Sequence, residues 1–477
     1  MSRPPADAAA LALALDRNGD EPLAAQMTRQ LRALILGGRL RDRARLPSSR
    51  TLAIDLGVSR ATIVEAFEQL ASEGFVEGRR GAGVFVSPGL VGAAERRAAS
   101  APSPAARRPV AIRPFELGAV DPDLAPFGEF SKLLRNHWRR PSPALLGRVD
   151  GFGWPELRAA VARHLEEWRG FVCDAERIVV TAGSADAMGL LARLVLTVGD
   201  AAVVEDPGYG ALRAVLLDHG ARLLPVQVDA EGLDPRALPD ARLALTTPSR
   251  QFPLGGTMPV ARRLELIDWA ERQDALVVED DFDSEYRYVG APLPALASLD
   301  GSERVAYLGS FSKALFSSLR LGFVVLPARL VEPARVLLQR RATPASLIAQ
   351  PALAELIRSG HYAQHIRRSR RVYARRLAAL NRASRGWEDV FVLKPTDAGL
   401  HVVADLSPDF SDREVRAALA QAGVTVGALS DYYLGCPRRP ALLLNFAAFT
   451  EHEIVAGVAR MGAALRAMMS PNNGDAD

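Results

Sequence analysis

One lysine is the most informative side chain of this chain. Only three of its 59 Lys and Arg residues are lysines, and one of them, Lys313, follows small hydroxyl residues in Ser310-Phe311-Ser312-Lys313. Arginine can replace lysine as a charge, but its guanidinium stays protonated and forms no Schiff base. Lys313 is therefore a candidate anchor for an aldehyde cofactor such as pyridoxal phosphate. These four residues alone also allow an ordinary surface lysine.

Other residues could complete such a site, which needs an acid at the pyridine nitrogen, a surface against the ring and an anion cradle. Asp280 ends an apolar run, at the position where α/β sheets place ligand-binding side chains. Tyr209 offers an aromatic ring, and Gly183-Ser184 opens a predicted helix whose N–H groups could hold phosphate. Arg320 could pair with the same phosphate. Alone, each motif could equally be an acidic loop, a packed tyrosine or a plain turn.

A separate set of residues near the N-terminus indicates nucleic-acid binding. Five arginines lie within twelve residues, opposed by a single acid, Asp42: Arg39, Arg41, Arg43, Arg45 and Arg50. Such a cluster can contact phosphates and release counterions. Ser59-Arg60-Ala61-Thr62 opens a predicted helix whose start could reach bases, and Gly81-Ala82-Gly83 allows a close turn. The alternative is a basic solvated loop beside a small helical domain.

The elements that must position these N-terminal residues follow from apolar spacing and capping signals. They are a helix over 22–37, a helix capped by Ser48 or Ser49 that ends near Gly57, a helix capped by Ser59 and ended by Gly74, and strands at 75–77 and 84–86. Three helices and a glycine-rich hairpin predict a winged helix-turn-helix.

The rest of the chain alternates apolar strands with helices such as 184–197 and 260–272, which predicts an α/β fold with a mostly parallel sheet. Strands are expected at 177–181, 201–205, 222–226, 242–246, 275–279, 304–308 and 321–326. Arg-rich helices and strands at 399–405 and 441–446 indicate a small α+β C-terminal domain. The expected divisions are 15–87 for the winged helix, 88–112 for a flexible linker, 113–330 for the large domain, 331–469 for the small domain and 470–477 for a disordered tail.

Bulk properties narrow the class of protein. The net charge of +4 is only mildly basic, so local clustering has to carry the nucleic-acid argument. Two cysteines predict neither a disulfide framework nor a metal site. No apolar run is long enough to span a bilayer, and the N-terminus lacks the pattern of a secretory signal. We therefore expect a cytoplasmic protein that does not bind membranes.

Several N-terminal motifs resemble the GntR-type winged helix over residues 21–87. They are Leu46-Pro47-Ser48-Ser49-Arg50, Leu56-Gly57-Val58-Ser59-Arg60, Phe67-Glu68-Gln69-Leu70 and Glu73-Gly74-Phe75. The resemblance implies a double-stranded DNA operator as partner. It implies DNA contacts by Arg45, Arg50, Ser59, Arg60, Thr62 and Gly83. Glu65 departs from the pattern, because many relatives carry another residue there, often arginine.

The order and spacing of the remaining motifs resemble the fold-type I aminotransferase body of MocR/GabR-type, or PdxR-like, regulators. The resemblance rests on Thr247-Pro248-Ser249, Gln251-Phe252-Pro253, Glu279-Asp280-Asp281, Asp283-Ser284-Glu285, Gly309–Lys313 and Gly360-His361-Tyr362. It implies a Schiff base at Lys313, Asp280 at the pyridine nitrogen and Tyr209 against the ring. It also implies a homodimer, and phosphate binding by Gly183, Ser184, Ser310 and Arg320.

Some positions depart from that family. Phe282 lacks the hydroxyl that relatives place near the cofactor, and Arg250 replaces a usual histidine. No arginine occupies Leu442–Phe446, where transaminases hold the substrate carboxylate, and Ala211 stands where a GABA-responsive relative carries arginine. A missing carboxylate clamp argues against efficient transamination, because positioning supplies several kcal/mol of the barrier.

Three hypotheses remain at this point. The first is a transcriptional regulator that senses pyridoxal phosphate or an amine through Lys313, without physiological turnover. The second is an active aminotransferase with an appended DNA-binding domain, which the missing clamp disfavours. The third is a DNA-binding protein whose body is a cofactor-free dimerisation scaffold, which the retained Lys313, Asp280 and Arg320 disfavour.

Overall fold

The computed structural model describes residues 13–17, 19, 21–79, 81–89, 113–147, 150–291, 293–341, 345–436 and 439–469. Contacts divide the chain into two compact units, Met1–Val110 and Ala111–Asp477, and each is described by itself. The tail expected at 470–477 and all but two residues of the linker expected at 88–112 lie outside the described residues.

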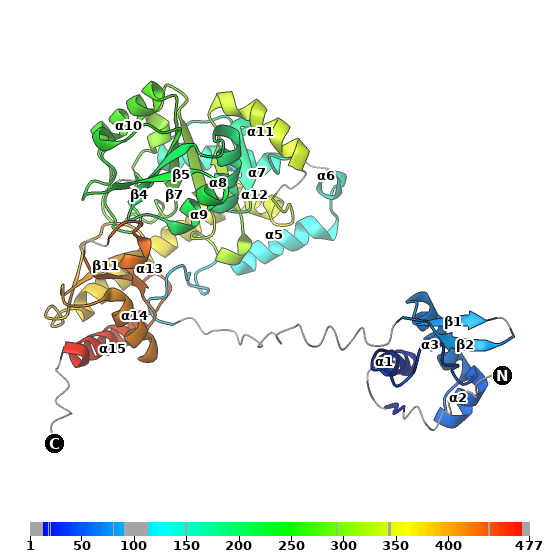
Figure 1. Ribbon diagram of the computed structural model, residues 1–477. Coiled ribbons are helices and arrows are strands. Elements are labelled where there is room, and N and C mark those ends of the chain that lie inside the picture. Colours follow the sequence, from blue (N-terminus) through cyan, green and yellow to red (C-terminus); the bar gives the residue numbers. More distant parts are fainter. Residues whose placement is uncertain are drawn as a thin grey trace, which may run out of the picture. The chain divides into compact units, whose positions relative to one another are not determined.

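The first unit consists of three helices and a two-stranded hairpin (Figure 1, blue). These are α1 (Leu23–Leu36), α2 (Ser49–Leu56), α3 (Arg60–Ser72), β1 (Val76–Arg79) and β2 (Gly83–Val86). Ser48 caps α2 by accepting the N–H of Thr51, and Gly57 ends this helix in the left-handed conformation that glycine tolerates. The predicted winged helix is confirmed, although α3 ends two residues before Gly74.

Apolar side chains at helical spacing form the core of this unit. Met27, Leu31 and Ile35 on α1 are fully buried against Ile63 and Leu70 of α3. The segment before α2 extends the hairpin, since Leu46 N–H donates to the Val84 carbonyl and Arg45 bridges to Phe85. The arginine-rich segment is thereby held along the wing.

A seven-stranded sheet forms the centre of the second unit. Its strands are β3 (Ile178–Thr181), β4 (Ala201–Asp206), β5 (Arg222–Gln227), β6 (Leu243–Thr246), β7 (Leu276–Asp281), β8 (Val305–Ser310) and β9 (Gly322–Val325). Their order is β3-β9-β8-β7-β6-β4-β5, and only β9 runs antiparallel to its neighbours. The predicted mostly parallel sheet is confirmed by the parallel pairing of β4 to β8. Apart from the edge strand β5, its strands are buried on both faces and most carry continuous apolar runs.

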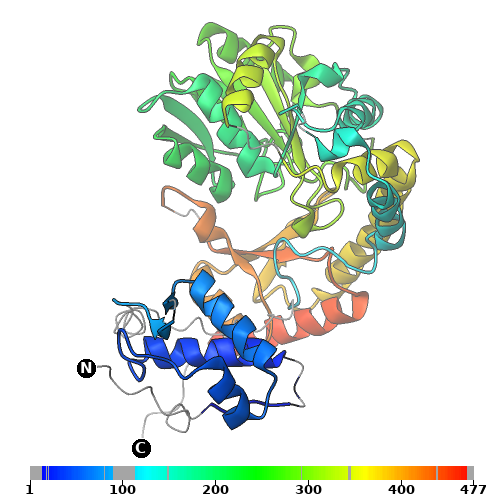
Figure 2. The same cartoon turned by 90° about the vertical axis from the view of Figure 1, so that its right-hand side faces the viewer.

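Helices cover both faces of this sheet (Figures 1 and 2). One core includes side chains of α8 (Ser184–Val195), α9 (Gly210–Asp218) and α11 (Ala328–Arg341). The other includes side chains of α5 (Phe127–Arg139), α7 (Pro155–Arg169), α10 (Val260–Arg272) and α12 (Gln350–Arg358). A short helix, α6 (Pro143–Leu146), precedes α7. Successive strand residues alternate between the two cores, as Val203 and Val204 do on β4.

A second, four-stranded antiparallel sheet follows in the chain. It has the order β10-β11-β13-β12, with β10 (Phe391–Leu393), β11 (His401–Leu406), β12 (Gly427–Ala428) and β13 (Ala441–Asn445). Its helices are α13 (His361–Ala383), α14 (Asp412–Gln421) and α15 (Glu451–Met469). Side chains of β11, β13 and α15 belong to the same apolar cluster as one face of the large sheet. Within the described ranges, no helix is long and apolar enough to cross a membrane.

Candidate functional site

A pocket of about 440 Å³ lies where several strands of the large sheet end. All seven residues that the sequence predicts for the cofactor line it: Gly183, Ser184, Tyr209, Asp280, Ser310, Lys313 and Arg320. They come from segments as far apart as the start of α8 and the loop before β9. The structure therefore brings together every residue of this set, at the strand ends where open α/β sheets bind ligands.

Asp280 differs from the two acids that flank it. Glu279 accepts two backbone N–H groups of the short helix Leu296–Leu299, at 3.0 and 2.9 Å. Asp281 forms an ion pair with Arg169 at 2.8 Å. The Asp280 carboxylate has no hydrogen-bond partner among the described residues and lines the pocket instead. Only this acid of the three is thus available to a ligand.

Burial shapes the charges in the pocket. It is the main cause that raises the pKa of Asp280 to about 7, and the nearby carboxylates of Asp281, Glu205 and Asp283 raise it further. A cation opposite Asp280 would reverse this shift. Burial also lowers the pKa of the Lys313 amine, against the opposing charge of Asp283. A lowered pKa leaves more of the amine neutral, which is its nucleophilic form.

One end of the pocket has the features of an anion cradle. Helix α8 begins at Ser184 after Gly183, whose φ of 109° requires glycine, and no described side chain caps its first N–H groups. A Cβ on Gly322 would lie 3.1 Å from the Gly183 Cα, so the backbones approach closely here. The Ser310 hydroxyl and the exposed guanidinium of Arg320, which has no ion-pair partner within the described ranges, line the same pocket.

Aromatic side chains form a wall beside Tyr209, which is 40% exposed. Its ring meets Phe252 edge-on with centroids 5.4 Å apart, and the rings of Phe282, His401 and Tyr432 contact Phe252 at 5.2 to 5.5 Å. Phe282 fills its place in this cluster without a hydroxyl. Sequence reasoning missed His401 and Tyr432, because they approach only through the second sheet.

Arg250 lies behind this wall and not in the pocket. Its guanidinium donates to Asp283 at 3.1 Å and to the His401 carbonyl at 2.8 Å, and all three side chains are buried. Gly399 has a φ of 87°, and a Cβ there would overlap the guanidinium. Arg250 replaces the family's usual histidine, and its guanidinium fits here because Gly399 has no side chain.

Asn445 is a further pocket residue that sequence reasoning missed. Its amide donates to the carbonyls of Glu116 and Ala119, at 2.8 and 3.0 Å, and so fixes the loop between them. In that loop, a Cβ on Gly118 would lie 3.4 Å from the Lys313 Nζ, and the φ of Gly118 is 83°. The absence of a side chain at this position keeps the amine accessible.

The pocket provides few anchors for a carboxylate. Side chains alternate along β13, so Leu443 is on the same face of the strand as the pocket residue Asn445. Leu443 is completely buried among apolar side chains and offers no charge to a carboxylate. Ala211 lines the pocket, whereas Arg213 donates to the Tyr432 carbonyl at 2.8 Å. In the described part of the chain, Lys313 and Arg320 are the two cationic side chains of the lining.

The predicted DNA contacts form two groups on the first unit. Ser59 caps α3 by accepting the N–H of Thr62 at 3.1 Å, and Arg60 donates to the Ser49 hydroxyl at 3.4 Å. That bond holds the start of α3 beside the first turn of α2, which carries the exposed Arg50. The first group thus presents two arginines and two hydroxyls near a helix start.

The second group lies at the wing. The Arg45 guanidinium passes 3.1 Å from the position of a Cβ on Gly83, whose φ is 109°. Glu65 of α3, which departs from the winged-helix pattern, lies away from both groups. It lines a pocket together with Glu21, which precedes α1, and Glu73, which follows α3. Glu65 faces α1 and does not join the predicted contacts.

Comparisons with known proteins agree with both units. The family model for bacterial regulatory proteins of the gntR family matches residues 23–86, and that for aminotransferase class I and II matches residues 142–461. The probable rhizopine catabolism regulatory protein MocR of Rhizobium meliloti is 37% identical, over 96% of this chain and 97% of that protein. The pyridoxine biosynthesis transcriptional regulator PdxR of Corynebacterium glutamicum is 35% identical, over 92% and 95%.

The fold also resembles solved structures. An archaeal alanine:glyoxylate aminotransferase has a TM-score of 0.70 at 24% identity, and the match covers 75% of this chain and 92% of that chain. Aminotransferase domains of class I and II imply pyridoxal phosphate, and the pocket fits it: an amine, an unpartnered carboxylate, an aromatic wall and an anion cradle surround one cavity. The chain belongs to the MocR family of HTH-type regulators, which join a GntR-type domain to an aminotransferase class I and II domain.

Proposed function

We propose that this protein is a DNA-binding transcriptional regulator whose response depends on pyridoxal phosphate bound in the body. The observation that carries the proposal is the convergence on one pocket of Lys313, Asp280 and the five other predicted cofactor residues. When bound, pyridoxal phosphate supplies an aldehyde that amines attack and a ring that withdraws electrons. A winged helix in the same chain supplies the DNA-binding part.

Each pocket residue has a distinct role in this proposal. Lys313 holds the cofactor covalently, since it is the one amine in the described lining. Asp280 faces the pyridine nitrogen, because it is a buried carboxylate without a protein partner. Tyr209 packs against the ring. The phosphate lies at the start of α8, with Gly183, Ser184, Ser310 and Arg320.

The DNA contacts follow the two groups on the winged helix. Arg50, Arg60 and the hydroxyls of Ser59 and Thr62 bind the operator from the start of α3, and Arg45 binds phosphate beside the wing at Gly83. Two such domains from a homodimer would read two half-sites.

The effector is either pyridoxal phosphate itself or an amine without a carboxylate. Both cationic side chains of the described lining, Lys313 and Arg320, are engaged by the cofactor in this proposal, and Leu443 adds no charge. An amino acid would therefore leave its carboxylate without a charged partner in these walls. A robust steady-state transaminase rate with common amino acids would overturn this proposal.

The cofactor part is tested by absorbance. The full-length protein with pyridoxal phosphate is expected to show a visible band that borohydride removes, and proteolysis should then locate the label on Lys313. Lys313→Ala should lose the band, whereas the control Lys132→Ala, which changes an exposed lysine of α5, should keep it. No band in the unaltered protein would contradict the proposal and leave the scaffold hypothesis.

The regulatory part is tested by DNA binding. Fluorescence anisotropy with the DNA upstream of the protein's own gene is compared with and without pyridoxal phosphate, and with amines added. A change in affinity in the unaltered protein that Lys313→Ala abolishes supports a cofactor-dependent regulator. If the DNA affinity is the same with and without pyridoxal phosphate and amines, DNA binding does not depend on the pocket, and the proposal is contradicted.

A further inference from the structure

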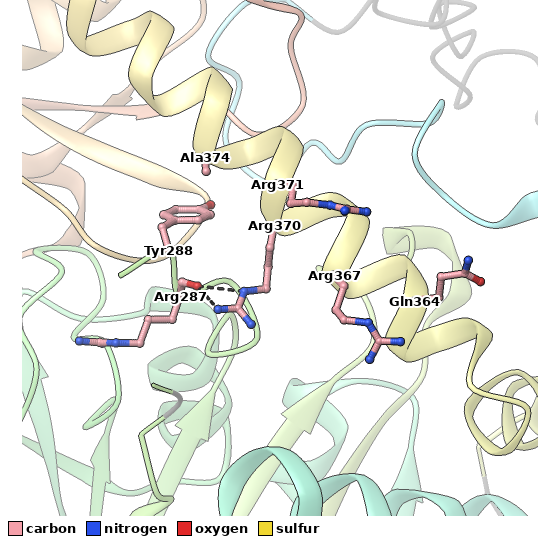
Figure 3. Close-up of a pocket in the computed structure, with 7 residues that line it drawn as sticks. All are labelled: Arg287, Tyr288, Gln364, Arg367, Arg370, Arg371 and Ala374. Carbon is pink, nitrogen blue, oxygen red and sulfur yellow. Dashed lines mark hydrogen bonds between the residues drawn. The ribbon is translucent and has the colours of Figure 1, made fainter. Parts of the chain in front are cut away.

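A second pocket of the body is lined by arginines. It has a volume of about 430 Å³ and lies between the loop at Arg287-Tyr288, beyond the end of β7, and the exposed side of α13 (Figure 3). Its described lining contains four arginines and no acid: Arg287, Tyr288, Gln364, Arg367, Arg370, Arg371 and Ala374. None of these residues lines the cofactor pocket.

The spacing on α13 creates the basic wall. Gln364, Arg367, Arg371 and Ala374 are three or four residues apart, so they lie on one face of the helix, and Arg370 is next to them. The short side chain of Ala374 leaves room at one end. Like charges at this spacing destabilise a helix by a few tenths of a kcal/mol, so the arrangement does not serve the stability of α13.

These arginines also lack the partners that arginines have elsewhere in the chain. Many exposed arginines pair with acids, as Arg236 does with Asp234 at 2.8 Å and Arg466 with Asp389 at 2.8 Å. Within the described ranges, no carboxylate pairs with Arg287, Arg367, Arg370 or Arg371, and the Nε of Arg287 is buried without an acceptor. The pocket therefore has an uncompensated positive charge.

One of the four guanidinium groups is held in place. The Arg287 carbonyl accepts hydrogen bonds from the Arg370 Nε, at 2.9 Å, and from its Nη2, which holds this side chain against the loop at Arg287-Tyr288 (Figure 3). Arg367 and Arg371 extend from α13 in other directions (Figure 3). Cations that are spread around this pocket suit a ligand with several anionic groups better than a single small ion.

We propose that this pocket binds an oligophosphate, that is, a ligand with two or more phosphate groups along a chain. Guanidinium groups bind phosphate oxygens through paired, charge-assisted hydrogen bonds, and four arginines without carboxylate partners can contact at least two phosphates. Either a free polyphosphate compound or the backbone of bound DNA offers this chemistry. The site is separate from the cofactor pocket and does not depend on the function proposed for it.

The pocket is connected to the cofactor site by a short path. The Tyr288 hydroxyl donates to the Gly399 carbonyl at 2.6 Å, and Arg287 bridges to Ala398. The next residues, Leu400 and His401, line the cofactor pocket. An oligophosphate that moves Arg287 or Tyr288 therefore bears on the wall of the cofactor site.

Binding is tested with tripolyphosphate and full-length, cofactor-loaded protein by titration calorimetry. Arg367→Ala/Arg371→Ala is expected to weaken binding at least tenfold. The control Arg382→Ala/Arg385→Ala removes the same charge from exposed positions near the end of α13, outside the pocket, and is expected to bind like the unaltered protein. The visible cofactor band of both variants checks that the body remains folded and loaded.

The source of the phosphate is tested by the salt dependence of DNA affinity. If DNA occupies the pocket, the slope of log K against log salt should fall by about 2 in Arg367→Ala/Arg371→Ala, because each phosphate contact contributes about 0.9. An unchanged slope with lost tripolyphosphate binding identifies a free ligand. If neither tripolyphosphate affinity nor slope distinguishes this variant from the control, the proposal is overturned.

Discussion

Replacing Asp280 by asparagine should stabilise the cofactor-free protein and weaken its hold on the cofactor. Burial and neighbouring carboxylates raise the pKa of Asp280 from 3.8 to about 7. A rise of about three pH units corresponds to about 4 kcal/mol, at about 1.4 kcal/mol per unit. Asparagine has nearly the same shape and no charge, so Asp280→Asn should remove most of this penalty.

The pH dependence has a definite sign. A group whose pKa is raised on folding contributes stability that is complete below the unfolded pKa and is lost as the pH rises through the folded pKa. For Asp280 this window runs from pH 3.8 to about 7. The advantage of Asp280→Asn over the unaltered protein should therefore grow by about 3 kcal/mol between pH 5 and pH 8, and then stay constant.

Urea unfolding of the cofactor-free protein at pH 5 and pH 8 measures this difference. Asp281→Asn is a matched control, because its carboxylate is paired with Arg169, and breaking a buried pair should cost about 3–5 kcal/mol. With saturating pyridoxal phosphate, the unaltered protein should be more stable than Asp280→Asn, because the protonated pyridine nitrogen of the cofactor favours a charged Asp280. If Asp280→Asn is no more stable than the unaltered protein at pH 8, the reasoning is refuted.

Three further predictions concern other parts of the chain. Arg250→Met should lower the free energy of unfolding by about 3 kcal/mol, since it leaves the charge of Asp283 buried and unpaired, and the additional change Asp283→Asn should restore part of it in the same urea assay. Ser59→Ala should cost the first unit about 1 kcal/mol through the lost cap. It should also weaken operator binding in anisotropy, whereas unchanged stability would contradict the cap. Gly118→Val should weaken cofactor binding at least tenfold in absorbance titrations, because its side chain approaches Lys313 and its φ of 83° disfavours any other residue; unchanged affinity would show that the loop yields freely.

The strands of the large sheet could be predicted within one or two residues, because buried parallel strands are continuous apolar runs. The direction of β9 could not, since an antiparallel strand buried on both faces, such as Gly322–Val325, has the same pattern. The choice of Asp280 over its neighbours was within reach of the sequence. Alternation along β7 places Glu279 and Asp281 on one face and Asp280 on the other, which is the face covered by α8.

The second half of the pocket could not be predicted. His401, Tyr432 and Asn445 reach it through the pairing of β11 with β13 and through a loop of the small sheet. Such contacts join residues far apart in the sequence, and no local pattern specifies them. The role of Phe252 as the centre of the aromatic wall was hidden for the same reason, since its partners come from four separate segments.

The fit between Arg250 and Gly399 limits the order in which substitutions can accumulate in this lineage. A side chain at position 399 would overlap the Arg250 guanidinium. Gly399 therefore cannot be replaced while Arg250 is present. A smaller residue at Arg250 leaves Asp283 without its partner and opens a void, so that step is costly as well. The two positions form an epistatic pair, in which each residue is tolerated because of the other. Homologues with histidine at the first position are thus expected to be free to carry larger residues at the second.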